Sequence, residues 1–305
     1  MDTPSQIRRL LDAVNISPTR QRSAFRFFRR TRAESLISHV RELSATLTEC
    51  RPAELLSEVR TVRSAVFCSG GSYTPEVLIA ASALAAEALR RSHRIEMYDV
   101  QLLAVLHLAQ GRIIQMATGE GKTFVAVAAA LILALGGRGV HVMTPNVYLA
   151  ERDCMTATSA ATHLGLTVGL TPEQGAEADK RQAYDCDVTY GTGHEFGFDY
   201  LRDQLALRQQ AQQPLGTRIL RRIAPNLPSG RAAIQRGLAY AVVDEADSVM
   251  FDEATSPLVL SAGSTGRAPD EAAHMAAMQL APKLSDRTHY SISSLTSQVL
   301  SLIHI

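Results

Sequence analysis

The sequence predicts an α/β fold in which a parallel sheet lies between helices. Three observations support this prediction. Short apolar runs typical of buried strands alternate with longer helical runs, a glycine-rich loop at 116–123 separates an apolar run from a helix-forming run, and another apolar run ends in Asp244-Glu245. Repeated strand–helix units form parallel sheets, and ligands bind at the carboxyl ends of the strands. Both polar motifs fall at such ends.

Composition sets the next bounds. The chain has 305 residues, 46% of them hydrophobic and 20% charged, which is a globular profile for one large or two ordinary domains. Lys and Arg number 31 against 30 for Asp and Glu, so no basic excess indicates a nucleic acid, and no specific nucleic acid partner is expected. The cysteines and histidines have no spacing typical of a disulfide framework or a zinc site.

No membrane span or signal peptide is expected. The longest apolar run, residues 125–135, is far shorter than the ~20 residues that a spanning helix needs. The first residues are polar and the following segment is rich in arginine, which is not the pattern of a secretory leader. A reducing, cytoplasmic setting fits this composition.

The expected elements follow in chain order. Residues 1–95 are mostly helical, with apolar residues at three- and four-residue spacing through 74–88. Helices are expected at 124–135 and 146–164, with Pro145 at the start of the second. Strands are expected at 112–116, 140–144, 166–170, 186–190 and 238–243. Residues 208–236, with paired glutamines, three prolines and several arginines, are expected to form an exposed insertion.

Three domains are expected from these patterns. They are a helical N-terminal region over 1–95, a RecA-like, helicase-type nucleotide-binding core over 96–260, and the start of a further domain over 261–305, entered through a hinge at 261–266.

The loop at 116–123 has the residues that a phosphate-gripping Walker A loop needs. Its glycines let backbone N–H groups turn toward phosphate oxygens, its lysine places an ammonium on the β and γ phosphates of ATP, and its threonine hydroxyl is a ligand for Mg²⁺. The predicted nucleotide-binding residues are Gly119, Glu120, Gly121, Lys122 and Thr123. The full pattern has glycine where this chain has Met116, so an ordinary glycine-rich turn is the alternative.

The acidic pair supports the nucleotide interpretation. Residues 238–243 form an apolar strand that delivers Asp244 and Glu245 at its carboxyl end. In P-loop ATPases the first such carboxylate holds Mg²⁺ and the second polarises the attacking water. Lys122, Asp244 and Glu245 are therefore the predicted catalytic residues, with Thr123 and Asp244 on the metal.

Several runs together resemble the SecA preprotein translocase ATPase family. The similarity extends over about residues 40–285, and its most specific run is Gly-Phe-Asp-Tyr-Leu-Arg-Asp at 197–203. The other matching runs lie at 98–103, 118–123, 139–144, 146–153, 189–192, 243–248 and 252–254. In that family an arginine commonly precedes the Thr-Gly-Glu-Gly-Lys-Thr run, and this chain has Ala117 there.

The resemblance implies a motor that couples ATP turnover to export of unfolded preproteins through the SecYEG channel, on the cytoplasmic face of the inner membrane. It implies that Gln101 reads the adenine, whereas by itself Gln101 is more simply a polar residue on a helix surface. A homodimer is compatible with the sequence, which does not decide the oligomeric state.

The resemblance also implies a second RecA-like domain that supplies an arginine finger. Such an arginine is worth orders of magnitude in rate, so this chain is expected to bind ATP better than it hydrolyses it. Residues 261–305 are then the truncated start of the preprotein-crosslinking domain and are expected to pack poorly. The run 300–305 resembles a translated sequencing-adapter end, and a genuine apolar strand is the alternative.

The N-terminal segment carries a separate prediction. Arginines alternate with aromatic residues there, which suits an anionic phospholipid surface, RNA, or simply a solvated basic arm. The residues are Arg8, Arg9, Arg20, Arg22, Arg26, Arg29, Arg30 and Arg32 with Phe25, Phe27 and Phe28.

Two other classes of function stay open. Asp244-Glu245-Ala246-Asp247 also spells the signature of an RNA helicase, although the neutral charge balance disfavours that class. A non-catalytic nucleotide-binding protein is the other alternative, and it is favoured only if the short length is natural.

Overall fold

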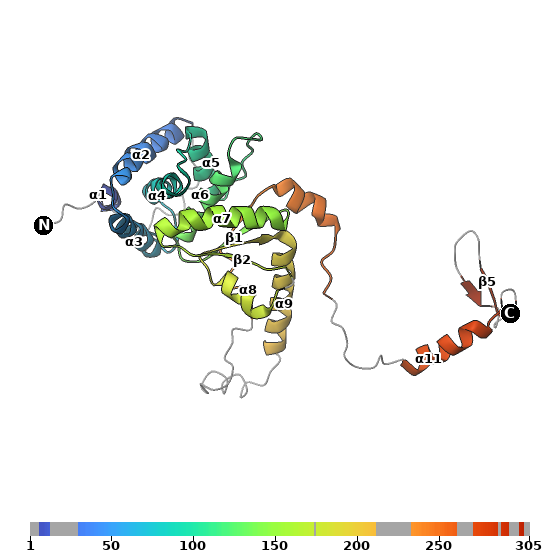
Figure 1. Cartoon of the computed structure of the whole chain (residues 1–305). Coiled ribbons are helices and arrows are strands. Elements are labelled where there is room, and N and C mark those ends of the chain that lie inside the picture. Colours follow the sequence, from blue (N-terminus) through green and yellow to red (C-terminus); the bar gives the residue numbers. More distant parts are fainter. Residues whose placement is uncertain are drawn as a thin grey trace, which may run out of the picture. The chain divides into compact units, whose positions relative to one another are not determined.

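The computed structural model describes residues 6–12, 30–173, 175–211, 233–260, 271–285, 288–292 and 299–301. The chain divides into two compact units, Met1–Leu258 and Val259–Ile305, and each is described by itself (Figure 1). The three-domain division made from the sequence stays a prediction.

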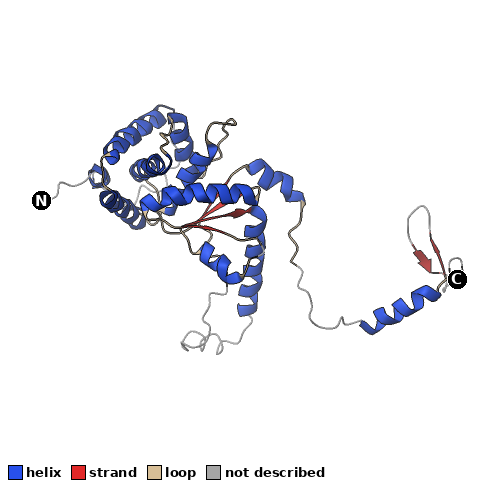
Figure 2. Cartoon of the chain, in the orientation of Figure 1, coloured by secondary structure: helices blue, strands red, loops and turns tan. Residues whose placement is uncertain are grey.

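Helices make up most of the described part of the first unit, and they surround a short sheet (Figure 2). The N-terminal helices are α1 (Gln6–Asp12), α2 (Arg30–Thr48), α3 (Pro52–Cys68), α4 (Pro75–His93) and α5 (Asp99–Ala109). The remaining elements of the unit are α6 (Lys122–Ala134), β1 (Val140–Thr144), α7 (Val147–Leu164), β2 (Val168–Leu170), α8 (Glu177–Tyr184), β3 (Val188–Thr192), α9 (Gly193–Ala211), β4 (Tyr240–Val243), η3 (Ser248–Asp252) and η4 (Glu253–Thr255).

The sheet is parallel and has the strand order β2-β3-β1-β4. Side chains alternate across it because successive residues of a strand point to opposite faces. Val140 and Val142 of β1 join the main core with α4, α6 and α7, whereas His141 packs on the other face against Tyr184 of α8 and Phe196 of α9. Helices therefore cover both faces, which confirms the predicted α/β fold.

Four of the five predicted strands form, and one does not. The strand at 140–144 has the predicted bounds, and the others begin about two residues late. The strand predicted at 112–116 is wrong, because residues 112–117 form an irregular connection in which Ile113 is 96% exposed. A strand forms only where its backbone pairs with a neighbouring strand. In the described sheet β4 is an edge strand, so residues 112–116 do not pair with it. The apolar character of Ile113 and Ile114 could not reveal this lack of a partner.

The N-terminal region is helical in its described residues, as predicted, and α4 is at its centre. Thr74 caps α4 by accepting a hydrogen bond from the Val77 amide. Most of the side chains of α4 are buried, and the helix packs against α2, α3, α6 and α7. The buried carboxylate of Glu87 is paired with Arg90 and Arg91 at 2.7 and 2.6 Å.

One turn before α4 connects this region to the sheet. The Tyr73 hydroxyl donates to the main-chain carbonyls of Ile132 and Leu133 at the end of α6, at 2.9 and 3.0 Å. The Tyr240 hydroxyl, at the start of β4, donates to the Gly71 carbonyl at 3.3 Å. The turn at 69–73 thus contacts the last residues of α6 and the first residue of β4, and these are the ends of the two elements that lie away from the predicted site.

The prediction that residues 208–236 form an exposed insertion is wrong for the last residues of this range. Ile234 and Gln235 are buried, and their backbone amides donate to the carboxylate of Asp203. A buried acceptor in α9 therefore fixes a segment that composition alone places in solvent. Residues 212–232 lie outside the described part of the chain.

The second unit contains α11 (Glu271–Leu280), η5 (Ala281–Lys283) and an antiparallel pair, β5 (Tyr290–Ile292) and β6 (Val299–Ser301). The expected hinge at 261–266 and the end of the apolar run at 302–305 are outside the described residues. So are residues 13–29, which hold most of the basic N-terminal segment. Across the described ranges, no helix has both the length and the apolar character needed to cross a membrane.

Candidate phosphate and metal site

The glycine-rich loop has the backbone that a phosphate cradle requires. Gly119 and Gly121 have φ angles of +86° and +79°, a left-handed conformation that side chains disfavour. Gly121 is the N-cap of α6, so Lys122 and Thr123 occupy its first turn. The first N–H groups of a helix have no partner within the helix and attract anions. The loop and the start of α6 thus have the backbone geometry that an anion site requires.

Gln101 holds this loop from outside. Its side chain is buried, its Nε2 donates to the Glu120 carbonyl at 2.8 Å, and its Oε1 accepts from the Tyr98 amide at 2.9 Å. A Cβ on Gly121 would lie 2.6 Å from the same Nε2, so the loop approaches Gln101 closely. The interpretation of Gln101 as a polar residue on a helix surface is wrong. Its predicted contact with adenine stays a prediction.

The acidic pair lies at the carboxyl end of β4. The Asp244 amide donates to the Met143 carbonyl at 2.9 Å, which extends the pairing with β1 by one residue. Glu245 is exposed and has φ +49°, a strained backbone for a residue with a side chain. Its amide donates to the Asp244 carboxylate at 3.1 Å. The two carboxylates therefore have different environments.

The charges around Asp244 explain the direction of its pKa. Burial raises the pKa of Asp244, and the neighbouring carboxylate of Asp153 raises it further. The Glu245 amide, the Lys122 ammonium and the Arg152 guanidinium oppose that rise. The loop lysine and the first acidic residue therefore act on one another across the end of the sheet.

Arg152 belongs to the same cluster and was missed by the sequence analysis. Its Nη2 donates to the Thr123 hydroxyl at 3.4 Å, and its Nε donates to the buried Asp153 carboxylate at 2.7 Å. It comes from α7, which starts at the carboxyl end of β1, the strand that neighbours β4. A charged pair about one and a half turns into the helix that follows a strand was the available signal. Arg152 thus supplies a second cation beside Lys122.

The oxygen donors suit Mg²⁺. Thr123, in the first turn of α6, offers a hydroxyl, and Asp244, after β4, offers a carboxylate, and both are hard oxygen ligands. Within the part of the chain that the structure describes, no group of three or more His, Cys, Asp or Glu residues is arranged for a metal.

The run at 197–203 contacts α8 and does not belong to the cluster around Asp244. Lys180 is 1% exposed, and its ammonium contacts the carboxylates of Glu195 and Asp199. Asp199 also accepts from Tyr184 at 2.9 Å and from Arg202 at 2.8 Å. The run thus joins α8 to α9 through a buried charge network.

An open pocket of about 450 Å³ lies between α7 and the end of α4. Its wall includes Arg152, and the ring of His93 meets that of Phe124, the residue after Thr123, at 5.9 Å. The remaining lining residues are Tyr148, Glu151, Met155, Thr156 and Ser159, all from α7.

A parallel sheet flanked by helices, with a glycine loop before a helix and an acidic pair after a neighbouring strand, defines the class of P-loop motor domains. The model of the SecA DEAD-like domain family matches residues 21–296. The chain belongs to this family.

Curated relatives agree over most of the chain. It is 38% identical over 260 residues to the protein translocase subunit SecA of Desulforudis audaxviator, covering 85% of this chain and 26% of the relative. It is 34% identical to that of Gracilaria tenuistipitata var. liui, covering 78% and 25%. It is 35% identical to that of Emiliania huxleyi, covering 89% and 28%. The chain thus spans about a quarter of the length of these relatives.

Proposed function

We propose that this chain is the nucleotide-binding part of an ATP-driven preprotein translocation motor. The observation that carries the proposal is Arg152, which donates to the Thr123 hydroxyl at 3.4 Å and, like Lys122, acts on the charge of Asp244 at one end of the sheet, beside two glycines with positive φ. A cation pair for phosphates, a hydroxyl and a carboxylate for Mg²⁺, and an adjacent exposed carboxylate are what phosphoryl transfer needs.

Each residue has a role in this proposal. Gly119, Glu120 and Gly121 present backbone to the phosphates, and Lys122 neutralises their charge. Thr123 and Asp244 hold Mg²⁺, which when bound offsets charge on the β and γ phosphates. Glu245, exposed beside Asp244, orients the attacking water, and Gln101 contacts the adenine edge.

The wider activity is inferred from the relatives, which are named protein translocase subunits. We assign to the complete protein the coupling of ATP hydrolysis to movement of unfolded preproteins through a SecYEG-type channel at the cytoplasmic face of the membrane. Contact of the basic N-terminal segment with anionic phospholipid belongs to this proposal. Residues 261–305 are assigned to the start of a preprotein-crosslinking domain.

Nucleotide binding is tested with the variant Lys122→Ala. Fluorescent ATP with Mg²⁺ is titrated into the whole chain, and the loss of one phosphate-binding cation is expected to weaken affinity by at least about tenfold. Lys283→Ala removes an exposed lysine of the second unit and is the matched control. Unchanged affinity in Lys122→Ala would overturn the proposal.

Coupling is tested on the complete product of the gene. ATPase activity is measured with unfolded preprotein and SecYEG vesicles in one arm and with RNA in the other. Stimulation by preprotein and vesicles supports the translocation motor. Stimulation by RNA alone identifies a helicase, and stimulation by neither, with binding intact, identifies a nucleotide-binding protein without motor activity.

A further inference from the structure

We propose that Arg41 is a positioning residue for nucleotide binding, which acts on the phosphate loop through the turn at 97–101. The inference rests on the proposed nucleotide function and extends it to a residue of α2. It follows from a continuous series of hydrogen bonds that runs from α2 to Glu120.

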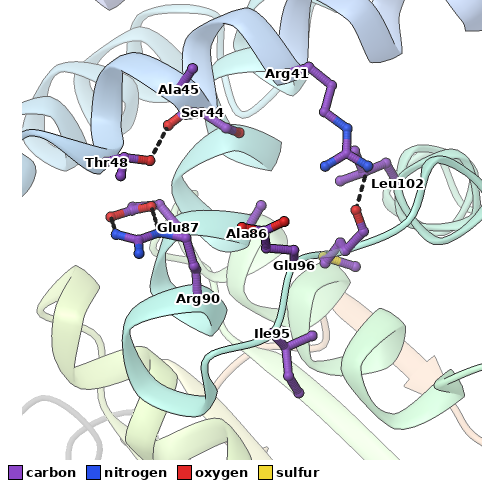
Figure 3. Close-up of a pocket in the computed structure, with 11 residues that line it drawn as sticks. Arg41, Ser44, Ala45, Thr48, Ala86, Glu87, Arg90, Ile95, Glu96 and Leu102 are labelled. Atoms are coloured by element: carbon purple, nitrogen blue, oxygen red, sulfur yellow. Dashed lines mark hydrogen bonds and ion pairs between the residues drawn. The ribbon is translucent and has the colours of Figure 1, made fainter.

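The first link joins α2 to the turn. Arg41 donates through Nε and Nη2 to the Asp99 carboxylate at 3.0 and 2.8 Å, and its Nη2 also donates to the main-chain carbonyl of Met97. Figure 3 shows Arg41 extending from its helix toward this turn, beside Leu102. One guanidinium therefore holds two acceptors that flank Tyr98.

The second link passes through the backbone of Tyr98. The Tyr98 amide donates to Gln101 Oε1 at 2.9 Å, and the Tyr98 carbonyl accepts from the amides of Gln101 and Leu102, both at 3.0 Å. With Oε1 occupied by the turn, the amide group of Gln101 has its Nε2 directed at the Glu120 carbonyl, 2.8 Å away. A displaced turn would release this orientation.

The packing near Arg41 leaves space on one side of the turn. A pocket of about 190 Å³ lies between α2, α4 and the start of α5, and Arg41 is part of its wall (Figure 3). Ser44, Thr48, Ala86 and Ile95 line the same space. Because close-packed side chains do not fill this volume, the turn has room to shift when the guanidinium is removed.

The expected size of the loss in ATP affinity follows from the exposure of Arg41 and its partners. The Arg41 and Asp99 side chains are 44% and 70% exposed, so their ion pair alone contributes little. The hydrogen bond to the carbonyl of Met97, whose side chain is buried, is the main contribution. Loss of one such bond is expected to weaken nucleotide affinity roughly threefold to tenfold.

The test compares Arg41→Ala with Arg51→Ala in the whole chain. Arg51 makes a similar exposed pair with Glu54 at 2.6 Å, at the start of α3. Titration with fluorescent ATP and Mg²⁺ is expected to show weaker binding for Arg41→Ala only, and hydrogen exchange to show a faster Tyr98 amide. Arg41→Lys keeps the charge but not the forked guanidinium, so its ATP affinity is expected to lie between those of Arg41→Ala and Arg51→Ala. This variant replaces Arg41→Ala in the test if the alanine variant does not fold.

A double variant shows whether Arg41 acts through Gln101. In the background of Gln101→Ala, adding Arg41→Ala is expected to cause no further loss, because the link is already broken. Additive losses, or unchanged affinity in Arg41→Ala while the wild-type chain binds ATP, would overturn this inference and leave the proposed function intact. A wild-type chain that binds no ATP would overturn the proposed function as well.

Discussion

The side-chain amide of Gln101 donates a 2.8 Å hydrogen bond to the main-chain carbonyl of Glu120. A residue of α5 therefore fixes the shape of a loop that starts well after that helix ends. The same amide nitrogen lies 2.6 Å from the position that a Cβ on Gly121 would occupy. The loop conformation and the position of Gln101 thus depend on one another.

Gly121→Ala is expected to weaken nucleotide binding by more than strain alone explains. Its φ of +79° makes any side chain costly by about 1 kcal/mol, and the new methyl group would also displace the Gln101 amide. Gly111→Ala, at φ +73° with nothing within 4 Å, is the matched control for strain. Urea unfolding should give a larger loss of stability for Gly121→Ala than for Gly111→Ala, and only Gly121→Ala should weaken ATP binding in the titration. Equal ATP affinities would show that the close approach to Gln101 is unimportant.

Glu245→Gly is expected to stabilise the protein while it abolishes hydrolysis. A residue with a side chain at φ +49° is strained, and glycine relieves roughly 1 kcal/mol of that strain. Arg94→Gly, at φ +56° on the end of α4, should stabilise by a similar amount without this loss. Thermal unfolding and ATP turnover of the complete protein measure the two effects. Retained turnover in Glu245→Gly would remove this residue from the proposed chemistry.

Lys180→Met is expected to destabilise the fold by about 3 kcal/mol, since it leaves the carboxylates of Glu195 and Asp199 without their buried cation. Arg202 still pairs with Asp199, which keeps the loss at the lower end of the range for buried pairs. Arg181→Met, on the same helix but in a more exposed pair with Glu177, should lose about 1 kcal/mol or less. Urea denaturation of both variants checks this order, and equal losses would contradict it.

Stability is expected to fall as the pH drops from 6.5 to 4, in part through His141. Burial, together with the nearby Arg236, lowers the pKa of His141 from 6.5 to about 4. In this window the unfolded chain binds a proton that the folded protein excludes, so acid favours unfolding, by roughly 3 kcal/mol at the lower end.

The control for this prediction alters the same cluster without removing a titratable group. His141→Phe should flatten the dependence of the unfolding free energy on pH, whereas Phe196→Leu, beside the same ring at 4.9 Å, should lower stability without changing its slope. A slope in His141→Phe equal to that of the wild type would contradict the assignment.

The sequence predicted elements best where local chemistry and tertiary packing agree. The strand at 140–144 alternates between two covered faces, and Asn146 caps the following helix through its side chain, so both were recoverable from the residues. The prediction of a strand at 112–116 was wrong because a pairing partner, and not apolar character alone, decides whether a strand forms. The prediction that Ile234 and Gln235 are exposed was wrong because the carboxylate that binds their amides, that of Asp203, is distant in the chain.

The candidate site shows the same division. The loop at 119–123 and the acidic pair are contiguous motifs with a stated chemistry, so the sequence was enough to single them out. Arg152 joins them only because β1 and β4 are neighbours in the sheet. The strained backbone of Glu245 and the bond between Gln101 and the loop are likewise products of the fold.

The turn at 69–73 limits how this protein can be shortened for laboratory work. Any clone that starts downstream of Tyr73 would leave the last carbonyls of α6 uncapped and the Tyr240 hydroxyl without its acceptor. Such a product would retain every residue that touches nucleotide in our proposal and still lose the anchor at the opposite end of the same helix. Trimming libraries for crystallisation should therefore keep the amino-terminal helices.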